Sequence, residues 1–86
     1  TAELNRVIND AMLVNPLPGG GSRKVKIYYA TQVSTAPPTF VFFSNKPEEI
    51  HFSYLRYLEN ALRQNFGFEG TPIRLIVREK SSKDVD

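Results

Sequence analysis

Basic and aromatic side chains gather in one short stretch of this chain, which has the sequence RKVKIYY from Arg23 to Tyr29. In an extended strand Lys24, Lys26 and Tyr28 share one face, because successive side chains point to opposite sides. Lysine and arginine neutralise phosphate, and a tyrosine ring can stack on a base. The spacing therefore predicts an RNA or partner contact at Arg23, Lys24, Lys26 and Tyr28. The alternative is a solvated sheet face on which Tyr28 packs against lysine stems.

Two further arginines, Arg74 and Arg78, lie on a predicted strand near the end of the chain and extend this surface if the faces align. The net charge of +2 and the pI near 9.1 are a mild bias. Such a bias permits RNA as a partner without requiring it. No apolar run approaches the roughly 20 residues that span a bilayer. We expect no membrane partner and no DNA partner.

Catalytic and metal-binding chemistry has little support in the sequence. There is no cysteine, so disulfides and thiolate metal sites are excluded, and His51 is the single histidine. A metal site would need carboxylates such as Glu48 or Glu49 to complete it. The glycine-rich stretch 16–22 follows a predicted helix and precedes a strand, the reverse of the order that a phosphate-binding P-loop requires. We expect His51 to make a local hydrogen bond at a helix start, and we expect no catalytic, cofactor or metal site.

Two amphipathic helices are predicted from apolar residues spaced three and four apart. The first covers residues 1–15 with Thr1 as its N-cap, and the second runs from its N-cap Ser53 to Phe66 and is ended by Gly67. A short helical turn begins at Pro47. The positions predicted to face the core are Leu4, Val7, Ile8, Ala11 and Met12 in the first helix and Leu55, Leu58, Leu62 and Phe66 in the second.

Three strands are predicted over residues 25–33, 39–43 and 73–79, where β-branched and aromatic residues are frequent. The first two form a hairpin, and the strands on either side of the second helix should be parallel. Alternation places Val25, Ile27, Tyr29, Thr31 and Val33 on one face of the first strand, with Lys24, Lys26, Tyr28, Ala30 and Gln32 on the other.

The order helix, strand, strand, short helix, helix, strand predicts an α+β two-layer sandwich, with both helices on one face of a three-stranded mixed sheet. Residues 1–80 are expected to form a single domain, and residues 81–86 a polar, disordered tail. The start at a threonine and the polar end suggest a domain excised from a longer protein.

Four segments together resemble one protein family. They are KIYYATQ (Lys26 to Gln32), PPTFVFFSN (Pro37 to Asn45), HFSYLRYLEN (His51 to Asn60) and FGFEGTPI (Phe66 to Ile73). They are similar to the C-terminal K-homology (KH)-like domain of the bacterial tandem-GTPase ribosome-assembly factors called Der or EngA. The resemblance covers nearly the whole chain, apart from the glycine-rich loop and the residues after Lys80.

A KH domain clamps RNA with a GxxG loop between two helices. The chain contains Gly67-Phe68-Glu69-Gly70, but these residues follow the long helix and precede the last strand. Where the clamp should lie, residues 46–52 contain no glycine and two carboxylates that would repel phosphate. We therefore expect a KH-like fold without a functional GxxG clamp.

The resemblance implies a parent protein with two GTPase domains that bind GTP or GDP with Mg²⁺, in the cytoplasm. It implies two kinds of partner: the GTPase domains of the same chain, and the 50S ribosomal subunit precursor with its rRNA. No GTP-binding motif is present in these 86 residues, so this chain is expected to be a non-catalytic module. The alternative is a purely protein–protein docking module that makes no direct contact with RNA.

Overall fold

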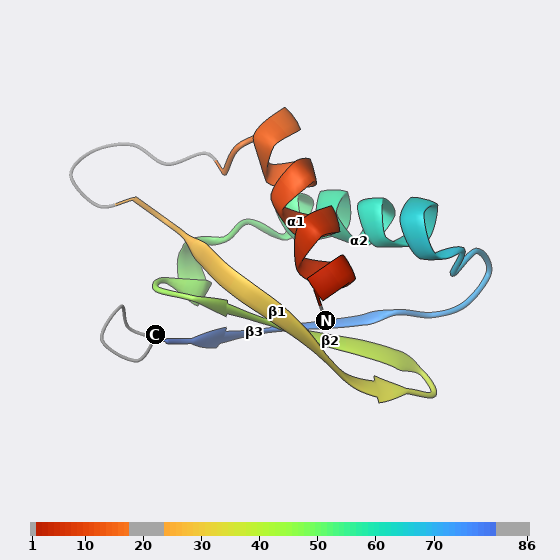
Figure 1. The fold of residues 1–86 in the computed structure, drawn as a ribbon. Helices are drawn as coiled ribbons and strands as arrows, with labels where there is room; N and C mark the ends of the chain where they lie inside the picture. Colours follow the sequence, from red (N-terminus) through yellow and green to blue (C-terminus); the bar gives the residue numbers. More distant parts are fainter. Residues whose placement is uncertain (1, 18–23, 81–86) are drawn as a thin grey trace.

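Both helices lie on one face of a three-stranded sheet, as Figure 1 shows. The computed structural model describes residues 2–17 and 24–80. Its elements, in chain order, are α1 (Ala2–Val14), β1 (Ile27–Thr35), β2 (Pro38–Ser44), the 3₁₀ helix η1 (Pro47–Glu49), α2 (Phe52–Phe66) and β3 (Arg74–Glu79). The predicted α+β sandwich and its element order are confirmed. The predicted tail, residues 81–86, and the predicted cap Thr1 lie outside the described residues.

The strands are arranged in the order β1-β2-β3, with β1 antiparallel and β3 parallel to the central strand β2. Both predicted strand directions are confirmed. The central position explains why β2 is apolar on both faces, since it has a neighbour on either side and is buried over most of its length. Phe40 and Phe42 face the helices, and Val41 and Phe43 point to the opposite side.

A β-bulge at Tyr28 corrects the predicted alternation in β1. Ile27 pairs with Ser44 and Tyr29 pairs with Phe43, so Tyr28 has no residue of its own opposite it. An inserted residue shifts the two-residue period of the side chains by one. Ile27 and Ala30 are consequently both buried in the core. The prediction that Ile27 shares a face with Tyr29, away from Ala30, was wrong.

The core confirms the helical periodicity. Leu58 and Leu62 of α2 have no exposed surface, and they meet the fully buried Phe42 of β2 and Ile8 of α1 in one cluster. The other predicted helix positions are either buried in this cluster (Leu4, Val7 and Ala11) or partly buried against it (Met12, Leu55 and Phe66). None of the described helices is long and apolar enough to cross a membrane.

The start of α2 differs from its prediction by the choice of cap. The N-cap is His51, whose Nδ1 accepts a hydrogen bond from the backbone N–H of Ser53 at 3.2 Å. An imidazole nitrogen can replace a hydroxyl as the acceptor for the second free N–H of a helix. The expected local hydrogen bond of His51 is therefore confirmed, and Ser53 as the cap was wrong. At the other end Gly67 takes the left-handed conformation (φ +73°) and ends the helix as predicted.

Two tyrosines of α2 bind the end of α1. The Tyr54 hydroxyl donates to the carbonyl oxygen of Asn15 at 2.8 Å, and the Tyr57 hydroxyl donates to that of Ala11 at 2.7 Å. The Ala11 carbonyl also accepts from the backbone N–H of Asn15 at 3.0 Å, so Tyr57 is a second donor to it, and the two tyrosine bonds hold α2 against the end of α1. Burial, reinforced by the neighbouring Tyr57, raises the pKa of Tyr54 from 10.0 to about 12.

Leu58→Ala should lower the free energy of unfolding by about 2–5 kcal/mol, because it leaves a cavity in a fully packed site. Leu13→Ala is the matched control: Leu13 is 79% exposed on α1, and its loss should cost less than about 0.5 kcal/mol. Chemical denaturation of both variants measures the difference. Equal losses would contradict the assignment of the buried helix face.

The raised pKa of Tyr54 predicts a loss of stability at alkaline pH. The folded protein holds the phenolic proton more tightly than the unfolded chain, so this contribution is complete below pH 10 and disappears as the pH rises towards about 12. Thermal melts across this range should show a steeper decline for the parent than for Tyr54→Phe, which cannot ionise. Parallel declines would exclude Tyr54 as the cause.

Candidate nucleic-acid interface

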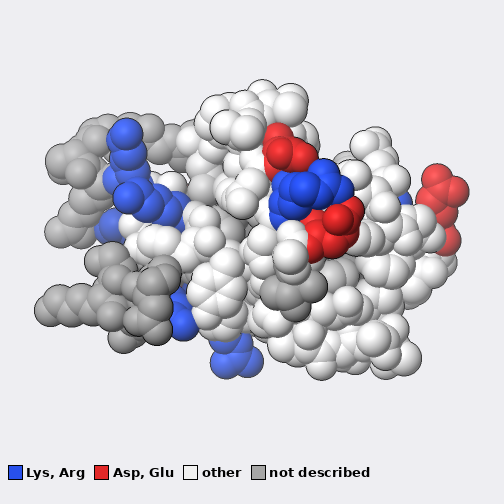
Figure 2. Space-filling model, in the orientation of Figure 1, with Lys and Arg blue, Asp and Glu red and all other residues white. Residues whose placement is uncertain are grey.

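Cationic side chains gather at one end of the sheet. Lys24 and Lys26 precede β1 at this end, and Arg78 lies close to the end of β3. Lys80 follows β3, and its backbone N–H donates to the carbonyl oxygen of Ser44 at the end of β2. In Figure 2 most of the visible Lys and Arg side chains lie towards the left, where β1 begins and β3 ends in Figure 1. Over α1, by contrast, the visible cation is flanked by carboxylates.

Asn45 fixes the backbone that carries the two lysines. Its Oδ1 accepts from the N–H of Lys26 at 2.8 Å, and its Nδ2 donates to the carbonyl of Lys24 at 2.8 Å. Both lysine side chains remain exposed. Tyr28 lines an open groove beside them, together with residues from the end of α1 such as Met12. The structure thus places Lys24, Lys26 and Tyr28 around one groove, while Arg23 lies outside the described residues; their contact with RNA or a partner stays a prediction.

Arg74 and Arg78 lie on β3, the edge strand on the other side of β2 from β1. Their register partners on β2 are Thr39 and Phe43, which point away from the helices. We call this surface the open sheet face and define it by Tyr29, Thr31, Thr39, Val41, Phe43, Arg74, Ile76, Arg78 and Lys80. The structure therefore divides the predicted contact residues between the β1 edge beside α1 and the open sheet face.

An aromatic pair on the open sheet face was missed by sequence reasoning. The ring centroids of Tyr29 and Phe43 lie 4.8 Å apart. The Lys80 ammonium lies 5.1 Å and 5.3 Å from these two centroids and donates a hydrogen bond to the Tyr29 hydroxyl at 2.7 Å. The sequence does show that Arg74, Arg78 and Lys80 alternate and so share one face of the last strand. It does not show that the rings of Tyr29 and Phe43 pair, because that pairing depends on the bulge at Tyr28.

The two possible clamp positions have no cradle for phosphate. At η1 the cation Lys46 is paired with Glu49 at 3.5 Å, and Glu48 is exposed beside it. The GxxG residues 67–70 end α2 and form a turn in which Gly67 and Gly70 both have positive φ. Arg63 closes this turn by donating to the carbonyl oxygens of Phe68 and Thr71 at 2.8 Å and 2.7 Å. These glycines thus end a helix and shape a turn, as the order of elements predicted.

Glu59 and Arg63 lie four residues apart on α2, a spacing and order that favour an ion pair. The structure forms this pair at 2.7 Å, and both side chains are partly buried. The contacts of Arg63 with the following turn were not predicted, since sequence spacing does not show that this turn folds back towards the helix. A planar guanidinium has several donors in a fixed geometry, so one side chain can serve the carboxylate and both carbonyls.

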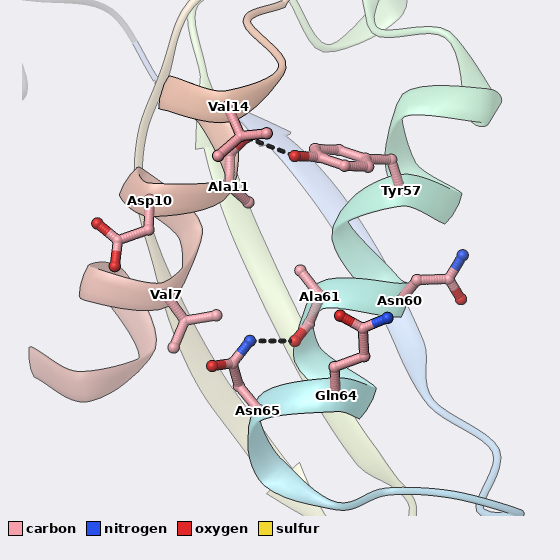
Figure 3. A pocket seen from close by; sticks show the side chains of 9 residues that line it. All are labelled: Val7, Asp10, Ala11, Val14, Tyr57, Asn60, Ala61, Gln64 and Asn65. Carbon is pink, nitrogen blue, oxygen red and sulfur yellow. Dashed lines mark hydrogen bonds between the residues drawn. The ribbon is translucent and has the colours of Figure 1, made fainter.

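A groove between α1 and α2 offers a surface of a different kind (Figure 3). Its apolar lining comes from Val7, Ala11 and Val14 of α1 and from Tyr57 and Ala61 of α2. The remaining lining residues are Asp10, Asn60, Gln64 and Asn65, so no cation lines it. Leu13 and Val14, at the end of α1, are 79% and 82% exposed. This side of the molecule is suited to a neutral, partly apolar partner.

Metal-binding chemistry gains no support from the geometry. Within the described residues, no group of three or more His, Asp or Glu side chains is placed to hold a metal ion. His51 uses its Nδ1 to cap α2, where it also contacts the Ser53 hydroxyl at 2.9 Å.

Comparisons with known proteins agree with the geometry. A family described as "KH-domain-like of EngA bacterial GTPase enzymes, C-terminal" matches residues 1–78. GTPase Der of Moorella thermoacetica is 65% identical over 78 residues, which cover 91% of this chain and 18% of that protein. GTPase Der of Alkaliphilus oremlandii is 57% identical over 84 residues, or 98% of this chain and 19% of that protein. The chain thus spans less than a fifth of the length of these relatives.

Proposed function

Because the chain belongs to the KH-domain-like family of the EngA bacterial GTPases, we propose that it is a non-catalytic module through which a larger GTP-binding protein contacts ribosomal RNA. The parent protein would act in assembly of the large ribosomal subunit in the cytoplasm. Its two GTPase domains would bind GTP or GDP with Mg²⁺, and their nucleotide state would control how this module is exposed. The 50S precursor and its rRNA are the proposed partners.

The observation that carries this proposal is the division of cations into paired and unpaired groups. Arg6, Lys46 and Arg63 form ion pairs with nearby carboxylates. Within residues 2–17 and 24–80, no carboxylate forms an ion pair with Lys24, Lys26, Arg74 or Arg78. A cation without a carboxylate partner can neutralise a phosphate without first breaking an ion pair. These four cations lie on and beside the sheet; among the described residues Arg56, exposed on α2, also forms no ion pair.

The absence of a phosphate cradle at η1 limits the mode of contact. Without a backbone clamp, affinity depends on the exposed cations and on stacking, both of which tolerate many sequences. The proposed contact is therefore salt-sensitive, and the position of the module on the ribosome would depend on the shape of the RNA and on the rest of the parent protein.

Lys26→Glu should weaken binding of large-subunit rRNA fragments, and Lys24→Glu with Lys26→Glu should weaken it further. Each lost phosphate contact should reduce the slope of log affinity against log salt by about one. Arg56→Glu is the matched control, since it makes the same charge change at an exposed position of α2. Titrations at several salt concentrations measure both effects. Equal losses for Lys26→Glu and Arg56→Glu would show that net charge alone is responsible.

A second function, docking on the GTPase domains of the parent chain, is favoured by the groove between α1 and α2. Its lining lacks cations, and the exposed Leu13 and Val14 continue it at the end of α1. An apolar patch of this kind is typical of a protein contact. This docking is compatible with RNA contact, because the groove and the open sheet face lie on opposite sides of the sandwich.

Val14→Lys should reduce association of this chain with separately produced GTPase domains by about tenfold or more, because a charge would be buried in the contact. A lysine is tolerated at the end of a helix, so the fold should be kept. Val33→Lys, a change on β1 at a position 58% exposed, is the control and should have no effect. Association measured by calorimetry that is equally strong for the parent and both variants would exclude this surface.

A further inference from the structure

The open sheet face is covered by none of the described elements. Both helices lie on the other face, as Figure 1 shows. Their buried side chains form one core cluster with Phe40 and Phe42. At the centre of the open sheet face Val41 is only 4% exposed, while Ile76 beside it is 38% exposed. None of the described elements therefore covers this face, and Ile76 gives it an exposed apolar side chain between Arg74 and Arg78.

The charge on this face has one sign. Arg74, Arg78 and Lys80 occupy alternate positions of one extended segment, so they project to the same side. The carboxylate of the segment, Glu79, occupies an intervening position. No Asp or Glu belongs to the open sheet face among the described residues. At about 3.3 Å per residue, the three cations are distributed along roughly 20 Å. An extended polyanion fits this arrangement.

The aromatic pair narrows the choice of ligand further than the cations do, because it favours a ligand with exposed bases. Tyr29 and Phe43 present two neighbouring rings at the end of the face where Arg78 and Lys80 lie. Rings next to cations are the arrangement that binds single-stranded nucleic acid, since bases stack on the rings while phosphates meet the cations. In a duplex the bases are stacked on one another, so their faces cannot reach a protein ring. An acidic protein surface would use the cations but would not need the rings.

We propose that the open sheet face binds single-stranded RNA, with bases stacked on Tyr29 and Phe43 and phosphates on Arg74, Arg78 and Lys80. This rests on the proposed RNA-binding function and names its surface and its ligand. Lys80 covers both rings in the free domain. On binding, a base takes the place of the Lys80 ammonium over the rings, and the ammonium moves to a phosphate of the same strand.

The two adjacent tyrosines provide the test, because Tyr29 belongs to the open sheet face and Tyr28 lines the groove beside α1. The probes are a short oligouridylate and a backbone of equal length without bases. Tyr29→Leu should weaken oligouridylate binding roughly 5- to 150-fold, which is the loss of one stacked base. Tyr29→Phe keeps the ring and should bind like the parent. Tyr28→Leu makes the same change at the β1 edge, and it should weaken oligouridylate binding much less than Tyr29→Leu does.

The backbone without bases separates stacking from charge. It should bind the parent more weakly than oligouridylate, and Tyr29→Leu should not weaken it further. Arg74→Gln, an exposed change that spares the fold, should weaken both probes and lower the salt slope by about one. Thermal melts confirm that each variant is folded.

The outcomes are distinct. A loss with Tyr28→Leu and none with Tyr29→Leu would place the contact at the β1 edge, which overturns this inference and leaves the proposed function intact. Equal binding of both probes would exclude stacking. If the parent bound neither probe nor rRNA fragments, the inference and the proposed function would fail together. If Arg74→Gln left RNA binding unchanged and abolished association with the GTPase domains, the face would be a protein contact.

Discussion

The central strand β2 is the element on which the rest of the structure depends. Its side chains at Phe40 and Phe42 form the base of the core, and both have almost no exposed surface. Its other side chains, Val41 and Phe43, build the middle of the open sheet face. The backbone of β2 meanwhile supplies hydrogen bonds to an antiparallel neighbour and a parallel one. One seven-residue strand therefore determines where the helices pack and what the opposite surface contains.

The edge strand β1 shows how polar side chains protect an exposed backbone. Asn5 of α1 accepts from the N–H of Ala30 at 2.8 Å and donates to its carbonyl at 2.9 Å. Asn45 binds the backbone of Lys24 and Lys26 on the opposite side, where it extends the pairing of β1 with β2. Unpaired edge groups invite pairing with another chain, and Asn5 occupies two of them. The same bonds hold α1 against β1 and fix the segment that carries the lysines.

In this chain the GxxG glycines lie at a different place from the cations that are proposed to bind phosphate. The GxxG sequence is used to end α2, and the position between the helices carries glutamates, so phosphate has no cradle at either place. Lys24, Lys26, Arg74 and Arg78, which form no ion pair with a described carboxylate, lie on and beside the sheet. A fold can keep its packing while the surface that meets the partner changes, because the core residues and the contact residues are different side chains. The helices and the sheet thereby present two chemically distinct sides.

The sequence by itself determined the local elements, the helix faces and the strand directions. Leu58 and Leu62 follow the helical period, and Gly67 ends the helix, because these properties depend on neighbours in the chain. The family could also be identified from the motifs. The sequence predicted only part of the division of cations into paired and unpaired groups. The i, i+4 spacing of Glu59 and Arg63 indicates their ion pair.

Tertiary structure decided which surfaces those residues form. The bulge at Tyr28 has no signature in the strand itself, because it arises from the pairing of β1 with β2. It exchanged the faces of Tyr29 and Ala30, brought Tyr29 onto Phe43, and left Tyr28 apart from Arg78. Whether residues distant in the chain share a face depends on strand order and register, and both are long-range contacts that the spacing of residues along one strand does not contain.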